Sequence, residues 1–234
     1  QQRSRLGDSD AGNFDQTAYR AYALYALTPQ LSLGASVGTE RSEFQMTDRR
    51  DSIRGVRMEW HPSERSTVLG NLESHFYGLG GTFKLSHRTP LFGLELTGAR
   101  SAYSPSVGRT LDPATGGNET ASLIGSILTT RYPDPAQRAV QVQNIIKSLN
   151  LPQTLDGPLD VFTSYAQIES RVDLRAMLYG RRSTWTASVF WVQRTHLSEL
   201  EGLFPGQFTG DNRQYGAEGN FEYLLSPVMT VDAN

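Results

Sequence analysis

A period-two alternation of apolar and charged side chains runs through much of this 234-residue sequence and is clearest around residues 167–178. Even positions from Ile168 to Leu178 are apolar or small, whereas odd positions from Gln167 to Arg175 are polar and mostly charged. Successive side chains of a strand point to opposite faces, but a helix would spread these charges around its circumference. The segment is therefore predicted to be a strand with one apolar and one charged face.

Nine further segments alternate in the same way, which gives about ten strands, most of them 8–13 residues long. Strands of soluble proteins run to about 5–6 residues, whereas a tilted membrane-spanning strand needs about 9–11. The length favours an all-β, up-and-down antiparallel transmembrane β-barrel. Besides 168–178, the segments are 17–27, 30–41, 52–61, 66–77, 81–88, 91–103, 184–197, 213–225 and 228 onward.

The connections between these segments alternate in length. Every second turn of a meander falls on the same rim, and outer-membrane barrels have short periplasmic turns and longer outer loops. All tight turns are therefore expected on one rim, which would be periplasmic. The tight links are Thr28-Pro29, 61–65, Thr89-Pro90, Arg181-Arg182 and Ser226-Pro227, and the longer or glycine-rich links are 42–51, 77–81, 104–160 and 198–212.

The tight turns also predict which residues face each other across neighbouring strands. A two-residue turn at Thr89-Pro90 pairs Lys84 with Glu95, and a turn centred on Leu79-Gly80 pairs His75 with Lys84. A turn at Arg181-Arg182 places one apolar row on the outer face, where we expect a continuous band. This turn pairs Leu178 with Trp185, Leu174 with Val189, Val172 with Trp191 and Glu169 with Arg194.

The charged face is the candidate lining of the barrel interior. Both signs of charge are mixed along it, which favours an interlocked polar lining over a selective aqueous passage. The candidate lumen-lining residues are Arg57, Glu59, Glu73, His75, Lys84, Glu95, Glu169, Arg171, Asp173, Arg175 and Arg194.

The insertion at residues 104–160 differs from the strands in its periodicity. Asp134 and Pro135 form a helix-start signature, and apolar residues then recur at helical spacing, which predicts a helix over Asp134–Leu149. A second helix is predicted over residues 120–130. Because the insertion is a long link, we expect the helix over Asp134–Leu149 on the long-loop rim, away from Pro29, Pro62, Pro90 and Pro227. Two placements of the helix pair stay open, one over the rim and one inside the barrel.

Several functional classes find no support in the sequence. The net charge of −2 gives no electrostatic case for nucleic acid, and the absence of cysteine removes disulfides and thiolate sites. The four histidines show no metal-binding spacing, and the adjacent pairs Ser74-His75 and Ser86-His87 point to opposite faces of a strand. No catalytic, metal or cofactor-binding residue is predicted, and the protein is not expected to be an enzyme.

A family resemblance is carried by four short runs in a fixed order. They are Trp60-His61-Pro62-Ser63-Glu64-Arg65-Ser66, Phe76-Tyr77-Gly78, Leu85-Ser86-His87-Arg88-Thr89 and Tyr132-Pro133-Asp134-Pro135-Ala136-Gln137-Arg138-Ala139. Together they resemble the outer-membrane β-barrels associated with the PEP-CTERM/exosortase system. The resemblance implies a bacterial outer-membrane location and a role in envelope transport or assembly linked to exopolysaccharide. The implied partners are outer-membrane lipid and exopolysaccharide or envelope export components.

The sequence is thus interpreted as a single-domain fragment, residues 1–234, of a longer barrel whose signal peptide is missing. Two alternatives remain open at this stage. A soluble β-barrel or β-sandwich that binds a ligand would bury the apolar face and expose the charges. An outer-membrane hydrolase would need a convergent polar cluster.

Overall fold

The computed structural model describes residues 2–4, 14–44, 47–103, 120–148, 151, 167–196, 211–226 and 229–233, and the statements below concern these residues. They form eleven strands and two helices. The strands are β1 (Gln2–Ser4), β2 (Phe14–Thr28), β3 (Leu31–Phe44), β4 (Thr47–Ser63), β5 (Ser66–His75), β6 (Gly78–Arg88), β7 (Phe92–Tyr103), β8 (Gln167–Tyr179), β9 (Ser183–His196), β10 (Asn212–Ser226) and β11 (Met229–Ala233). The helices are α1 (Thr120–Leu128) and α2 (Pro135–Ser148).

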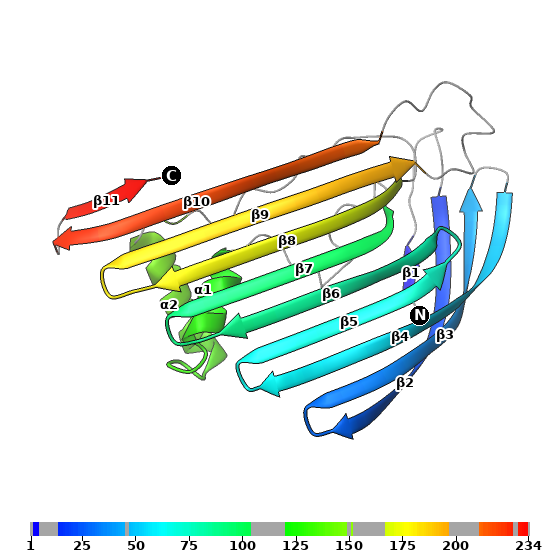
Figure 1. Ribbon diagram of the computed structural model, residues 1–234, viewed down its shortest axis with the longest axis horizontal. Coiled ribbons are helices and arrows are strands. Elements are labelled where there is room, and N and C mark those ends of the chain that lie inside the picture. Colours follow the sequence, from blue (N-terminus) through cyan, green and yellow to red (C-terminus); the bar gives the residue numbers. More distant parts are fainter. Residues whose placement is uncertain are drawn as a thin grey trace.

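The strands form one antiparallel sheet in which each strand pairs with its neighbours in sequence, from β1 to β11 (Figure 1). The ten expected strands and their up-and-down order are confirmed, and β1 is an additional short strand. Within the described residues β1 pairs with β2 and β11 with β10, so the sheet is open rather than closed into a barrel.

The hairpin of β8 and β9 has the predicted register. Leu178 pairs with Trp185, Leu174 with Val189, Val172 with Trp191 and Glu169 with Arg194. Its turn is closed by a 2.8 Å hydrogen bond from Gly180 N to Ser183 O. The short loop and the alternation on both strands act together to fix this register.

The register predicted for β6 and β7 is wrong by two residues. Lys84 pairs with Thr97 and Ser86 with Glu95, so Lys84 and Glu95 are diagonal neighbours. The turn is longer than expected because proline fixes φ near −65°, whereas the usual two-residue hairpin turns need positive φ. Thr89 closes the longer loop by donating from its backbone N to Phe92 O at 2.6 Å. A shift of two residues leaves every side chain on its predicted face.

The turn expected at Leu79-Gly80 lies instead at Phe76 and Tyr77. His75 pairs with Gly78, and Lys84 faces Leu69 rather than His75. Gly78 has a φ of 98°, a conformation that residues with a Cβ rarely adopt. The turn therefore forms where glycine permits this backbone geometry.

The face that carries the charged residues is concave at its N-terminal side. Arg20 on β2 contacts Glu73 on β5, and Ser36 on β3 also contacts Glu73, although β4 lies between β3 and β5. Neighbouring strands are about 4.8 Å apart, so a flat sheet would hold these side chains too far apart for such contacts. Figure 1 shows β2, β3 and β4 bending away from the plane of the later strands.

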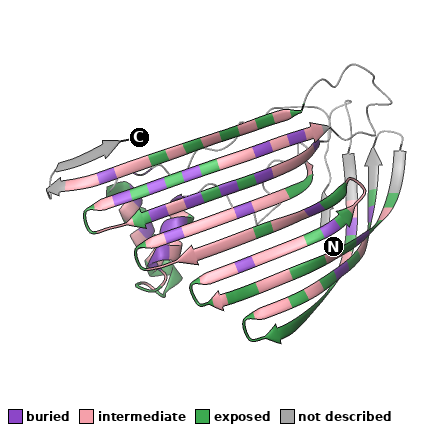
Figure 2. Cartoon of the chain, in the orientation of Figure 1, coloured by how far each residue is buried: buried purple, intermediate pink, exposed green. Residues whose placement is uncertain are grey.

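The opposite, convex face is apolar and exposed, as predicted for the band on β8 and β9. The exposed fractions there include 38% for Leu174, 51% for Trp185 and 50% for Val189. Val172 and Leu178 are also exposed, and Trp191 lies on the same face but is half-buried. Figure 2 shows the resulting alternation of buried and exposed positions along these strands.

Both predicted helices are present, and the Asp134 side chain caps α2 by accepting a 3.0 Å hydrogen bond from Ala136 N. The predicted position of α2 on the long-loop rim is wrong, because α2 packs on α1 and α1 lies at the opposite, short-turn end. α1 packs against β7 and β8 beside the Thr89-Pro90 turn, where Arg88 Nη1 donates to Ser126 O (Figure 1). The strand count is correct, so the helix pair must lie along the sheet rather than above its long-loop rim. None of the described helices is long and apolar enough to cross a membrane.

Gly78→Ala is expected to lower the free energy of unfolding by about 1–2 kcal/mol, because an L side chain at positive φ crowds its own backbone. Gly70→Ala is the matched control, since a Cβ at either position would meet no atom within 4 Å, whereas Gly78 alone of the two has positive φ. Urea denaturation of both variants measures the difference. An equal change in the two midpoints would contradict this account of the turn.

Candidate functional site

All eleven candidate lumen-lining residues lie on the same face of the sheet. The strand registers place Glu95 beside Arg175, Glu169 beside Arg194, and Arg57 beside Asn71 on this face. The register errors described above were even numbers of residues, so they moved none of these side chains to the other face. The contacts Glu169–Arg194 and Lys84–Glu95 were predicted from the sequence, and the other pairs among the candidates come from the structure.

The pairs on β8 and β9 are deeply buried. Arg194 Nε donates to Glu169 Oε2 at 2.7 Å, and Arg171 Nη2 donates to Asp173 Oδ1 at 2.6 Å. Arg194 and Arg175 are 3% and 4% exposed. Buried charges are costly unless they are paired, so these contacts make the charged face compatible with its burial.

Glu95 joins the central strands by contacting two cations. Lys84 Nζ lies 2.8 Å from Glu95 Oε2, and Arg175 Nη1 lies 3.4 Å from Glu95 Oε1. The predicted contact between Lys84 and Glu95 is confirmed, although it runs diagonally between β6 and β7. On β4, Arg57 Nε donates to Glu59 Oε1 at 2.9 Å, and this pair is more exposed than the others.

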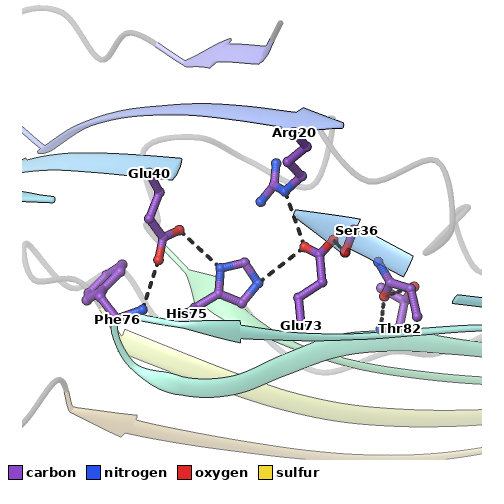
Figure 3. Close-up of polar contacts among 8 residues, drawn as sticks. Arg20, Ser36, Glu40, Glu73, His75, Phe76 and Thr82 are labelled. Atoms are coloured by element: carbon purple, nitrogen blue, oxygen red, sulfur yellow. Dashed lines mark hydrogen bonds and ion pairs between the residues drawn. The ribbon is translucent and has the colours of Figure 1, made fainter. Parts of the chain in front are cut away.

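Glu73 and His75 belong to a second cluster, which we call the Glu73 cluster: Arg20, Ser36, Glu40, Glu73 and His75 (Figure 3). Arg20 Nε donates to Glu73 Oε2 at 3.2 Å, and Ser36 Oγ donates to Glu73 Oε1 at 2.9 Å. Glu40 is 1% exposed and Glu73 5%. These contacts connect β2, β3 and β5 across the concave face.

The imidazole of His75 lies between the two carboxylates of the cluster (Figure 3). Its Nδ1 is 3.0 Å from Glu40 Oε2 and its Nε2 is 3.5 Å from Glu73 Oε2. Glu40 Oε1 also accepts a 2.8 Å hydrogen bond from Phe76 N. Glu40 thereby holds both the end of β5 and the turn that follows it.

Tyr77 covers the ring of His75. The two rings are stacked, with centroids 4.9 Å apart and an interplanar angle of 4°. Burial raises the pKa of Tyr77 to about 12, so its phenol is neutral over the physiological range. The turn between β5 and β6 thus closes one side of the Glu73 cluster with a neutral aromatic side chain.

Two glycines provide the space that the Glu73 cluster occupies. Gly55 lies between Ser36 and Glu73 in register, and a Cβ there would be 2.6 Å from both Ser36 Oγ and Glu73 Cγ. Gly80 faces Glu73 from β6, and a Cβ there would be 2.9 Å from His75 Cδ2. The side chains of β3 and β5 meet across β4 because Gly55 has no side chain.

The sequence reasoning missed Arg20 and Glu40. A signal for Glu40 was available, since the even positions from Ser32 to Glu40 are small or polar while Leu31, Leu33 and Val37 alternate with them. Arg20 had no such signal, because both phases of β2 contain tyrosine, leucine and alanine. Its role depends on curvature, which alternation does not encode.

Among the described residues, no group of three or more His, Cys, Asp or Glu side chains could hold a metal ion. Ser66 Oγ and His87 Nδ1 are 2.8 Å apart across β5 and β6, a pair that the sequence reasoning did not consider. Within the described residues no carboxylate contacts this histidine. Ser63 Oγ donates to Ser66 Oγ, so the three side chains form a short hydrogen-bonded chain across the ends of β4, β5 and β6.

No family model, curated protein or solved structure matches this chain. The resemblance to PEP-CTERM-associated outer-membrane barrels therefore remains a prediction from the sequence.

A double-mutant cycle with Lys84→Met and Glu95→Gln is expected to give a coupling energy of about 0.2–1 kcal/mol, as for other cross-strand ion pairs. The measurement is urea denaturation of the wild type, both single variants and the double variant. Lys84 and Glu169, which share the face without contacting each other, form the control pair and should be additive. Absence of coupling between Lys84 and Glu95 would contradict the diagonal contact.

Gly55→Ala is expected to lower the free energy of unfolding by about 1–3 kcal/mol, because the added methyl group overpacks the space between Ser36 and Glu73. Gly219→Ala on β10 is the control, since a Cβ there would meet no atom within 4 Å. Thermal or urea unfolding distinguishes the two variants. Equal stability would show that the Glu73 cluster does not depend on the gap at Gly55.

Proposed function

We propose that this chain forms part of the wall of an outer-membrane β-barrel, with its convex face against lipid and its concave face toward the interior. The observation that carries the proposal is the inverted distribution of polarity. Arg171, Arg175 and Arg194 are buried on the concave face, while Leu174, Trp185 and their neighbours are exposed on the convex face. Membrane barrels show this pattern, whereas water-soluble proteins tend to bury large apolar side chains.

The strand lengths support the same proposal. β3 and β9 have 14 residues, β8 has 13 and β10 has 15. A tilted strand needs about 9–11 residues to cross the hydrocarbon core. Each of these strands is longer than that, and its additional residues would lie in the interfacial regions of the bilayer. Strands of soluble sheets are usually about half as long.

The alternative of a soluble ligand-binding barrel or sandwich requires the reverse arrangement. Its apolar residues would fill a closed core, and its charged residues would face water. In this chain Val189 is half exposed and Asp173 is 5% exposed. The distribution of exposure therefore favours the membrane proposal over the soluble one.

The proposed role is non-enzymatic: envelope transport or assembly linked to exopolysaccharide and PEP-CTERM sorting. This part rests on the sequence resemblance. The concave lining supports a structural role for most of its charges, because they occur in compensated pairs such as Arg194 with Glu169. A lining of this kind is wettable without selecting strongly for one sign of charge.

Leu174→Arg is expected to destabilise the protein in phospholipid vesicles by about 2–4 kcal/mol, because it places a charge near the bilayer midplane. Leu178→Arg is the matched control. It lies on the same strand and face but next to the turn, so its cost should be about 0–1 kcal/mol. Equilibrium refolding into vesicles measures both values.

A water-soluble protein would respond differently to these two variants. Both positions are exposed, at 38% and 44%, and exposed sites generally tolerate arginine within about 0.5 kcal/mol. Equal and small effects, or a failure of the full-length protein to insert into vesicles, would refute the proposed function.

A further inference from the structure

The turn between β8 and β9 carries two arginines at the short-turn rim of the sheet. Arg181 and Arg182 are consecutive residues of this turn, and both are exposed. Gly180 N donates to Ser183 O across the turn, and Leu224 N of β10 donates to Arg182 O at 2.8 Å. The backbone that bears the two guanidinium groups is therefore held by β8, β9 and β10.

The positive charge of this turn is not neutralised by the strands around it. Neither Arg181 nor Arg182 has an ion-pair partner in the part of the chain that the structure describes. The carboxylates of β8, β9 and β10 all lie on the concave face, and they are Glu169, Asp173, Glu218 and Glu222. On the convex side of this rim, the two arginines are available to an anion from outside the sheet.

Aromatic side chains lie next to the two arginines on the convex face. We call Trp185, Phe221 and Tyr223 the rim aromatic row. Trp185 faces Phe221 in register with ring centroids 4.1 Å apart, and the Phe221 and Tyr223 centroids are 6.4 Å apart. Tyr223 faces Ser183, the residue that follows Arg182, and Trp185 is 51% exposed. The row therefore begins beside the cationic turn and presents an apolar surface to the outside.

The order of these groups along the strands matches the order of groups in a phospholipid. Tryptophan and tyrosine favour the interface between hydrocarbon and water, and aliphatic side chains face the hydrocarbon. Leu174 and Val189, which are exposed, follow farther from the turn on the same face. Arg181 and Arg182 would then lie at the level of the phosphates, to which guanidinium groups donate paired hydrogen bonds.

We propose that Arg181, Arg182 and the rim aromatic row form a binding site for a phospholipid with a net negative headgroup. This inference rests on the proposed membrane function. The guanidinium groups bind the phosphate, and the aromatic row packs against the glycerol backbone and the first part of an acyl chain. A zwitterionic phospholipid has an ammonium group beside its phosphate, which repels the arginines. The site therefore prefers an anionic phospholipid such as phosphatidylglycerol.

The test identifies the lipid that lies next to Trp185, because brominated acyl chains quench tryptophan fluorescence on contact. In the full-length protein Trp185 is kept and all other tryptophans, Trp60 and Trp191 among them, are replaced by phenylalanine. The protein is reconstituted in phosphatidylcholine vesicles that contain increasing mole fractions of brominated phosphatidylglycerol or brominated phosphatidylcholine. Half-maximal quenching should need a several-fold lower mole fraction of the brominated phosphatidylglycerol.

Arg181→Gln/Arg182→Gln in the same background should remove this preference, so that both brominated lipids quench at equal mole fractions. The matched control is Arg65→Gln/Arg213→Gln, which removes the same charge from two other exposed arginines. Arg65 lies in the turn between β4 and β5, and Arg213 faces Gln193, about 27 Å along β9 from Trp185. The control should retain the preference.

Three outcomes would refute the site: equal quenching by the two lipids before the arginines are replaced, a preference that survives Arg181→Gln/Arg182→Gln, or an equal loss in the control. The last would show a general attraction between the protein's charge and an anionic surface. Failure of the protein to insert gives no flotation with vesicles and no quenching by either brominated lipid. That result would refute the membrane proposal itself and is thereby distinguishable from the other three.

Discussion

Several charged side chains on the concave face, among them Glu40, Glu73 and Arg194, are buried, and each of these lies beside a group of opposite charge or a hydrogen-bond donor. An unpaired buried charge costs far more than a paired one, so the strands can take only those positions that bring opposite charges together. Glu73 meets Arg20 and Ser36 only if the first strands bend toward one another. The contacts of Glu73, the bend of the first strands and the absence of a side chain at Gly55 therefore depend on one another.

Alternation predicted the faces of the strands well, because the side-chain period of a strand is fixed at two. It predicted register only where the turn was also interpreted correctly. The hairpin of β8 and β9 satisfied both conditions. At Pro90 and Gly78 the position of the turn depends on the φ values that proline and glycine permit. The predicted registers of these two hairpins were therefore wrong, each by an even number of residues.

The candidate site was predictable as a face but not as a set of contacts. Lys84 and Glu95 were close enough in sequence for a hairpin argument, whereas Arg20 and Glu73 meet through curvature over three intervening connections. The position of the helices was missed for a different reason. Met177 breaks the charged phase of β8, and an apolar residue in an inward position indicates that something apolar covers it.

The apolar surfaces of this chain fall into two kinds with different consequences. The patch at Met177 is covered by the protein's own helices, but the convex band is covered by nothing in the described structure. Lipid would cover that band, but lipid cannot hydrogen-bond to backbone groups. Among the described residues the sheet ends at β1 and β11, each of which pairs with a single strand, and sheets that span a membrane leave no edge unpaired. The membrane proposal therefore carries a structural requirement: each of these two edges must pair with another strand before the sheet can lie in a bilayer.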